Sequence, residues 1–257
     1  MKSQFFWYEL ATTDTAAATA FYTAVVGWEA DEMGGPHSGY TIVSAEGMGV
    51  GGIAPMPPGL PPQADFPRWS GYILVDDCDA AVARLEAAGA TIRRAPDDIP
   101  EVGRFAVIGD PGGAGFNILQ PLPRPDAKPP RHRMAPGNVG WHELYAHDGD
   151  AAYSFYAEQF GWTETSAMDM GSMGTYRLWA PEGEAEAVGG MMTKPPHMER
   201  PAWLFYFVVD SVNAAAERVT ANGGTVLNGP MPVPDGSFIV QASDPQGAMF
   251  ALVSKVP

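Results

Sequence analysis

The chain has 257 residues, a formal net charge of −15 at pH 7 and an apolar fraction of 46%. Nucleic acids and anionic membranes are bound through a basic face, so this charge argues against both partners. The lone Cys78 excludes an internal disulfide and fits a cytoplasmic location. No stretch approaches the roughly 20 apolar residues of a membrane span, and the N-terminal aromatic run is too short for the core of a signal peptide.

The sequence repeats itself. The residues WYEL at 7–10 return as WHEL at 141–144, an offset of 141 − 7 = 134, and the same offset relates Gly27 to Gly161 and Asp110 to Asp244. Such self-similarity is the mark of a tandem duplication, with two domains of ordinary size. We therefore predict a first domain over residues 1–120, a Pro-rich linker over 121–137 and a second domain over 138–257.

The first half reads as an ordered series of elements. Alternation over residues 5–12 predicts a strand, and Asp14 and Gly27 are suitable caps for an Ala-rich helix over 15–26. Gly-rich turns then separate short apolar runs, which predicts two or three antiparallel strands before a Pro-rich connection at 55–67. A second strand, helix and three strands follow at 69–75, 79–88, 91–94, 104–108 and 116–120. Each half is thus predicted to be a doubled βαβββ unit of the α+β class.

These landmarks resemble the vicinal oxygen chelate superfamily, which includes glyoxalase I, the bleomycin-resistance proteins and the extradiol dioxygenases. The resemblance rests on the Phe-Tyr pair in the first helix of each half, on the Gly-Trp pair that follows this helix, and on the Asp-Pro-x-Gly turn before the last strand. The resemblance covers both halves, and the chain is similar in particular to two-domain bacterial glyoxalase-like proteins. It implies that the paired βαβββ units of each half form a U-shaped sheet around a cleft, where metal-dependent members hold a divalent ion.

The positions that hold the metal in such members carry poor ligands here. The first-strand position, seven residues before the helix-capping Asp, is Trp7 or Trp141. The next is Ser70 or Leu204, and the closing Glu is replaced by Asn117 or Ala251. The glycines at 51–52 and 189–190 stand where a further carboxylate is expected. Since a zinc, nickel or iron site needs three or more N or O ligands, we predict no metal and no other cofactor.

Along each strand, the side chains that point to the same face as these positions are expected to face the clefts. The predicted ligand-binding residues are Trp7, Ser70, Tyr72 and Asn117 in the first half, and Trp141, Tyr145, Leu204, Tyr206 and Ala251 in the second. Each set also contains one carboxylate, Glu9 or Glu143, as a candidate catalytic residue. Aromatic walls with few polar groups are typical of small-molecule sites.

Three functions follow as alternatives. The first is a protein that binds a small aromatic or cationic molecule without metal, by analogy with drug-sequestering relatives. The second is a glyoxalase-like lyase or dioxygenase that uses a divalent metal, or Glu9 or Glu143 as a base. The third is a structural or partner-binding protein with vestigial clefts.

The candidate residues also have structural alternatives. The alternative role of each carboxylate is to order the sheet through a neighbouring Tyr, and that of each Trp is to pack in the core. His142 is expected to pack against the helix side. A monomer or a homodimer is compatible with the sequence.

Overall fold

A computed structural model describes residues 3–34, 38–58, 66–123, 131–171 and 174–257. Within these ranges the chain forms four consecutive βαβββ units, two in each half, which confirms the predicted α+β tandem. The first half contains β1 (Phe5–Thr12), α1 (Thr15–Val26), β2 (Glu29–Glu32), β3 (Thr41–Ala45), β4 (Met48–Pro55), β5 (Arg68–Leu74), α2 (Cys78–Ala87), β6 (Thr91–Ile99), β7 (Gly103–Gly109) and β8 (Gly115–Pro121). The second contains β9 (Val139–Ala146), α3 (Gly149–Phe160), β10 (Thr163–Asp169), β11 (Thr175–Ala180), β12 (Gly189–Thr193), β13 (Ala202–Val208), α4 (Val212–Ala221), β14 (Thr225–Pro232), β15 (Phe238–Ser243) and β16 (Met249–Ser254).

The first helix shows why the local prediction succeeds. Asp14 accepts a hydrogen bond from the Ala17 amide and caps α1 at its start. Gly27 ends the helix in the left-handed conformation, with φ of 86°, which a residue without Cβ adopts at no steric cost. Asp148 and Gly161 cap α3 in the same way, so the duplicated sequence encodes duplicated helix ends.

Each half forms one eight-stranded sheet. The strand order is β2-β3-β4-β1-β5-β8-β7-β6 in the first half and β10-β11-β12-β9-β13-β16-β15-β14 in the second. The two first strands of the βαβββ units lie at the centre, and each pairs in parallel with the last strand of its own unit, as Glu9 does with Gly52. The central strands therefore place their side chains in the middle of the sheet.

The compact units of the chain do not coincide with its halves. One unit, here the first unit, contains Met1–Phe6, Gly71–Pro129 and His142–Trp203. The second unit contains Trp7–Ser70, Pro130–Trp141 and Leu204–Pro257. Each unit thus combines one βαβββ unit from each half of the sequence.

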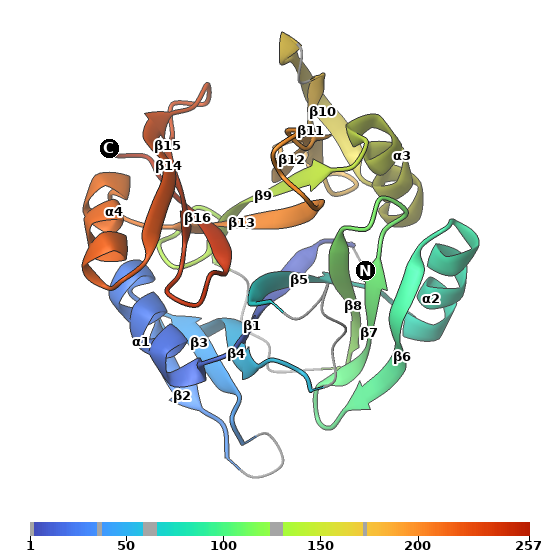
Figure 1. Ribbon diagram of the computed structural model, residues 1–257. Helices are drawn as coiled ribbons and strands as arrows, with labels where there is room; N and C mark the ends of the chain where they lie inside the picture. The colour runs from blue at the N-terminus through green and yellow to red at the C-terminus, as the bar shows by residue number, and fades with distance from the viewer. Residues whose placement is uncertain (1–2, 35–37, 59–65, 124–130, 172–173) are drawn as a thin grey trace. The chain divides into compact units, whose positions relative to one another are not determined.

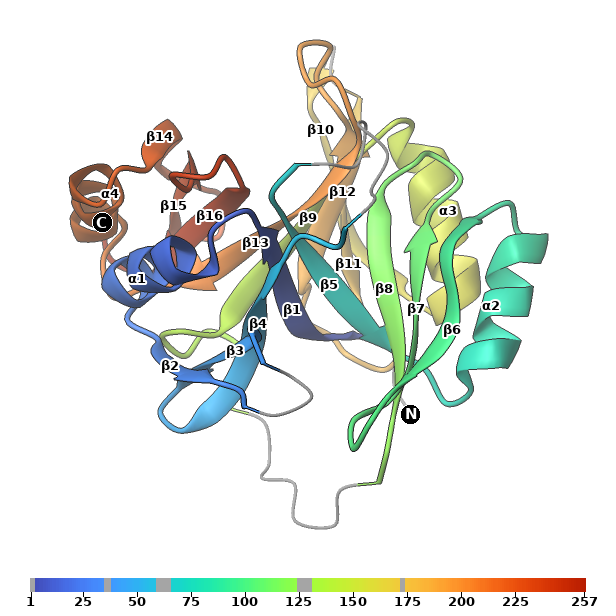
Figure 2. The same cartoon turned by 60° about the horizontal axis from the view of Figure 1, so that its bottom comes forward.

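Helices from different halves pack together inside each compact unit (Figure 1). In the second unit α1 lies beside α4, and the Arg218 guanidinium donates two hydrogen bonds to the Val25 carbonyl at 3.1 and 2.9 Å. In the first unit α2 and α3 lie side by side, as Figure 2 also shows, and Arg84 donates to the side chain and carbonyl of Gln159, at 3.1 Å each. In the described part of the chain, no helix is long and apolar enough to cross a membrane.

Strand β6 differs most from its predicted bounds, and the other elements of the second βαβββ unit differ by one residue at each end. Strand β6 continues to Ile99, beyond the predicted end at residue 94, because register shifts around Arg94 and Asp97 let the strand pass Pro96. Strand β8 includes Pro121, which was predicted to lie in the linker and pairs with Gly103. Residues 59–65 of the Pro-rich connection and 124–130 of the linker lie outside the described residues.

Candidate functional site

Trp7 and Glu9 lie on the more open face of β1. Along this strand Tyr8 and Leu10 are buried, whereas Trp7 and Glu9 between them are half-buried. The alternation of a strand therefore presents the indole and the carboxylate on one side of the central strand, where solvent reaches both. This is the side that the sequence predicted for ligand contacts.

The phenol of Tyr40 joins these two side chains within the second unit. The Trp7 Nε1 group donates a hydrogen bond to the Tyr40 hydroxyl at 3.0 Å. The same hydroxyl is hydrogen-bonded to the Glu9 carboxylate. Burial raises the pKa of Tyr40, and the Glu9 charge raises it further, so the phenol stays neutral and serves as the donor to the carboxylate. We refer to Trp7, Tyr40 and Glu9 as the Trp–Tyr–Glu cluster.

Glycines on β4 make room for the rings of the cluster. A Cβ added at Gly52, the residue that pairs with Glu9, would lie 2.0 Å from the Tyr40 hydroxyl oxygen. A Cβ at Gly49 would lie 3.1 Å from Cζ3 of Trp7. The missing side chains thus form a flat floor on which both rings lie, a common use of glycine inside a strand.

The superfamily's divalent ion does not fit the donor groups found here. Gly52 and its second-half counterpart Gly190 cannot carry ligand side chains, because the rings of Tyr40 and Tyr176 fill the space that a Cβ would enter. Among the described residues, no group of three or more His, Cys, Asp or Glu side chains is arranged to hold an ion. The side chains at the aligned positions are indole, hydroxyl, amide and aliphatic groups, which are weak or absent ligands.

Other predicted contact residues of the first half lie on β5 and β8. Tyr72 and Asn117 face each other in register in the first unit and are 5% and 4% exposed. The Tyr72 ring lies 6.5 Å from the ring of Phe105, over which the Arg94 guanidinium stacks at 4.7 Å. Ser70 is half-buried and belongs to the second unit. The structure thus groups Trp7 with Glu9 and Tyr72 with Asn117.

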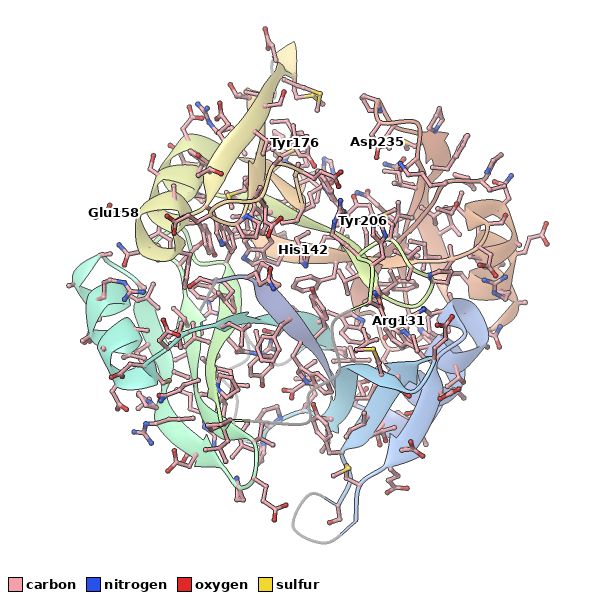
Figure 3. All side chains as sticks on the ribbon, turned by 180° about the vertical axis from the view of Figure 1, so that it is seen from behind. Arg131, His142, Glu158, Tyr176, Tyr206 and Asp235 are labelled. Carbon is pink, nitrogen blue, oxygen red and sulfur yellow. The ribbon has the colours of Figure 1, made fainter. Side chains whose placement is uncertain are left out.

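The second-half set is more enclosed. Glu143 is 8% exposed and Leu204, Tyr206 and Ala251 are at most 3% exposed, while Trp141 and Tyr145 are half-buried. In the first unit Glu143 pairs with Gly190, and the ring of Tyr176 from β11, labelled in Figure 3, fills the space that a Cβ of Gly190 would enter. In the second unit Tyr206 pairs with Ala251, and its hydroxyl accepts a hydrogen bond from Gln241 at 3.0 Å. The two halves thus repeat the same arrangement of residues, but the carboxylate of the second half is less exposed to solvent than that of the first.

His142 lies in the core of the first unit, where its label can be followed in Figure 3. Its ring stacks on Phe5 with centroids 5.0 Å apart, and Nδ1 lies 2.8 Å from the Val188 carbonyl oxygen. The side chain is 5% exposed. This packing gives the imidazole structural partners in the core.

Tyr40 and Gln241 were missed by reasoning from the sequence. Tyr40 lies at the start of β3, beside a turn, and its position in the repeat is shifted relative to Tyr176. The signal that was available is the Gly51–Gly52 pair inside a strand, since such glycines often mark the close approach of another group.

The sequence model of the Glyoxalase/Bleomycin resistance protein/Dioxygenase superfamily matches residues 4–118 and 138–252. The chain therefore belongs to this superfamily. It is 36% identical over 258 residues to the Mycobacterium tuberculosis protein named "Putative glyoxylase CFP32", with 98% of this chain and 94% of that protein covered. It is 32% identical over 259 residues to the anthracycline biosynthesis protein DnrV of Streptomyces peucetius, with 96% and 91% covered.

Solved structures share the fold at low sequence identity. The Mn(II)-bound glyoxalase from Novosphingobium aromaticivorans superposes with a TM-score of 0.67 and 17% identity, covering 99% of this chain and 82% of that one. The 2,3-dioxygenase LapB from Pseudomonas sp. KL28 gives a TM-score of 0.67 and 16% identity, covering 99% and 93%. At such identities the likeness establishes the fold alone.

Proposed function

We propose that the protein binds a small aromatic or cationic organic molecule at the Trp–Tyr–Glu cluster of the first half, without using a metal ion. The observation that carries this proposal is the half-buried placement of Trp7 and Glu9 on one face of β1, joined through Tyr40. An indole offers a flat apolar surface, and a carboxylate beside it offers one directional polar contact. This composition favours ligand binding over a surface that only packs.

The cluster favours binding over base catalysis. A phenol that donates to a carboxylate stabilises its ionised form, which makes the carboxylate a better counter-ion and a weaker acceptor of a substrate proton. The donor groups among the described residues fit a metal ion poorly, so they do not supply the metal that usually acts as the electrophile in the superfamily. The relative named for anthracycline biosynthesis supports an aromatic ligand, and we transfer that class as part of the proposal.

Ligand-induced thermal stabilisation tests the proposal. Chelator-treated protein is screened against an anthracycline, 2-phenylethylamine, 2-phenylethanol and phenylacetate. A ligand at about 100 times its Kd adds about 2.7 kcal/mol to the folded state, which raises Tm by several degrees for a chain of this size. We expect at least one probe to stabilise the wild-type protein without being consumed.

Variants at equivalent positions locate the site. We expect Trp7→Ala to abolish the thermal shift and Trp141→Ala, its counterpart in the second half, to retain it. Equal loss in both variants would contradict the placement in the first half. Turnover that disappears in Glu9→Gln would support the enzyme alternative instead, and the absence of any shift at millimolar probe would contradict ligand binding.

A further inference from the structure

Both ends of the Trp7 indole are fixed. At the pyrrole end, Nε1 donates a hydrogen bond to the Tyr40 hydroxyl at 3.0 Å. At the benzo end the ring lies against Gly49 of β4, where an added Cβ would come within 3.1 Å of Cζ3 and 3.4 Å of Cη2. A side chain held at two points loses little further freedom when a ligand contacts it. Trp7 is therefore a preorganised flat surface on the face of β1 that solvent reaches.

Tyr40 is fixed in turn by the strand beneath it. Its ring lies over Gly52, where an added Cβ would lie 2.0 Å from the hydroxyl oxygen and 2.1 Å from Cζ. Its hydroxyl accepts from Trp7 and donates to the carboxylate of Glu9, the residue that pairs with Gly52 in the ladder between β1 and β4. The position of the phenol, and through it that of the indole N–H, is thus set by two adjacent strands.

The two hydrogen bonds form a chain that polarises the indole. The donors point in one direction, from the Trp7 N–H to the Tyr40 oxygen and from the Tyr40 O–H to Glu9. Such bonds strengthen one another, because a phenol that donates to a carboxylate becomes a better acceptor. A stronger acceptor draws the N–H proton outward and leaves more electron density on the ring. The ring face is the negative side of the indole quadrupole, and it becomes more negative. Further contacts of Glu9 leave the bond from Tyr40 in place.

The second half differs from the first at the benzo end. Each half carries a pair of glycines on the strand that pairs with its first strand, Gly51–Gly52 and Gly189–Gly190. Two residues before the pair, the first half has Gly49 and the second has Ala187. A methyl group thus stands in the sequence where Gly49 leaves room for the indole of Trp7. We therefore place the selectivity described below in the first half.

A fixed, flat and electron-rich face complements a flat ring that is poor in electrons. Electron-withdrawing groups, such as conjugated carbonyl or nitro groups, weaken the negative face of an aromatic ring, so it stacks on an indole with less repulsion. We propose that the first-half cluster selects aromatic rings that carry electron-withdrawing groups and stack on Trp7, with Tyr40 as the residue that positions and polarises Trp7. This inference rests on the proposed function, because it names the ligand class of the same site.

A pair of probes with one shape tests stacking. 2-Phenylethanol and 2-cyclohexylethanol are neutral and similar in size, and both are titrated calorimetrically into wild-type protein. Burial alone favours the saturated ring, because its apolar surface is larger, whereas stacking favours the phenyl ring. We expect the phenyl compound to bind at least about threefold more tightly. Equal binding, or tighter binding of the cyclohexyl compound, would overturn stacking on Trp7 while ligand binding itself stands.

A substituent series tests the electronic preference. The probes are 2-(4-nitrophenyl)ethanol, 2-phenylethanol and 2-(4-methoxyphenyl)ethanol, in which the nitro and methoxy groups are similar in size and opposite in their effect on the ring. We expect the nitro compound to bind about three- to tenfold more tightly than the methoxy compound, with 2-phenylethanol between them. Equal affinities across the series would overturn the preference for electron-poor rings.

A conservative substitution tests the role of Tyr40. Tyr40→Phe keeps the ring over Gly52 and removes the hydroxyl that accepts from Trp7. We expect the ratio of nitro to methoxy affinity to fall towards one, with the affinity for 2-cyclohexylethanol unchanged. The matched control is Tyr176→Phe, whose ring lies over Gly190 in the second half, and we expect it to keep the wild-type ratio. A uniform loss of affinity for all probes in Tyr40→Phe would show that Tyr40 only packs, and would overturn its positioning role.

A second variant tests the other end of the indole. Gly49→Ala places a methyl group 3.1 Å from Cζ3 of Trp7, so the ring must shift by a few tenths of an ångström. We expect it to lower the preference for phenyl over cyclohexyl, whereas Gly34→Ala, at an exposed glycine with open space around it, is expected to leave this preference unchanged. An unchanged preference in Gly49→Ala would overturn the fixed position of the indole as its cause. If the wild-type protein binds none of these probes, both this inference and the proposed function fail.

Discussion

The Tyr22 hydroxyl donates a hydrogen bond to the Asp244 carboxylate at 3.1 Å, although 222 positions separate the two residues. Trp69 donates its indole N–H to the same hydroxyl at 2.8 Å, and the other oxygen of Asp244 accepts from the Ala248 amide at 2.9 Å. All of these groups are in the second unit and are buried. A sequence motif from the start of the chain is thus connected to a turn near its end.

The first unit repeats the same buried chain of hydrogen bonds. Trp203 donates to the Tyr156 hydroxyl at 3.0 Å, and Tyr156 donates to Asp110 at 3.2 Å. The Asp-Pro-x-Gly turns hold the carboxylates that join the two halves within each unit.

Tyr22→Phe is expected to destabilise the protein by about 1–3 kcal/mol, because it leaves a buried carboxylate oxygen and the Trp69 N–H without their partner. Tyr156→Phe is expected to cost a similar amount in the first unit. Chemical denaturation measures both, with Tyr153→Phe, at a half-buried tyrosine on α3, as the control. A change below about 0.5 kcal/mol, the range of ordinary surface substitutions, would show that these bonds contribute little.

The buried Asp244 makes stability depend on pH. Burial raises the pKa of Asp244, although hydrogen bonds from Ala248 and Tyr22 oppose the shift. The folded chain therefore keeps a proton that the unfolded chain has released, and stability must fall as pH rises from about 4, the ordinary value for Asp, through the raised pKa. This contribution is fully present at lower pH and is lost above the folded pKa.

Asp244→Asn removes this titration and keeps an oxygen for the turn. Over that pH window we expect the variant to gain stability relative to the wild-type protein, by up to about 1.4 kcal/mol for each pH unit. Unfolding midpoints measured between pH 4 and pH 7 give the difference directly. Exposed carboxylates with a lowered pKa, such as Asp79 and Asp97, affect both proteins alike and cancel. Parallel curves for the two proteins would contradict the prediction.

Local structure was predictable because its signals are local. The helix over 15–26 was predicted to the residue, since the Asp14 and Gly27 caps mark both of its ends. The extent of β6 was not, because an edge strand with bulges tolerates Pro96 and charged residues that a central strand would exclude. The repeat offset also predicted four βαβββ units correctly.

Long-range pairing could not be read from the repeat. The offset of 134 relates each residue to its equivalent in the other half, so it relates Tyr22 to Tyr156 and Asp110 to Asp244. It does not say which βαβββ units pack together, or that Tyr22 contacts Asp244. The candidate site was predictable only in part, for the same reason. Trp7 and Glu9 follow from strand alternation, whereas Tyr40 reaches them through a register between β3 and β4 that depends on three-dimensional packing.

Separated halves are expected to be incomplete. A fragment of residues 1–120 retains α1 and α2 but lacks Arg218 and Asp244, which contact α1 in the intact chain. We expect each half alone to be unfolded or to associate with a second copy of itself, and a mixture of 1–120 and 138–257 to form a one-to-one complex. Analytical ultracentrifugation with circular dichroism tests this. A half that is monomeric and unfolds cooperatively at the temperature of the intact protein would contradict it.

The most direct test of ligand binding without a metal ion is calorimetric titration of 2-phenylethylammonium into chelator-treated protein whose metal content has been measured by elemental analysis. We expect the metal-free wild-type protein to bind the ammonium, added Mn(II) to leave the affinity unchanged, and Trp7→Ala to lose the binding. Binding or turnover that appears only after a stoichiometric amount of Mn(II) has been taken up would contradict it, and would assign the site to the superfamily's metal chemistry.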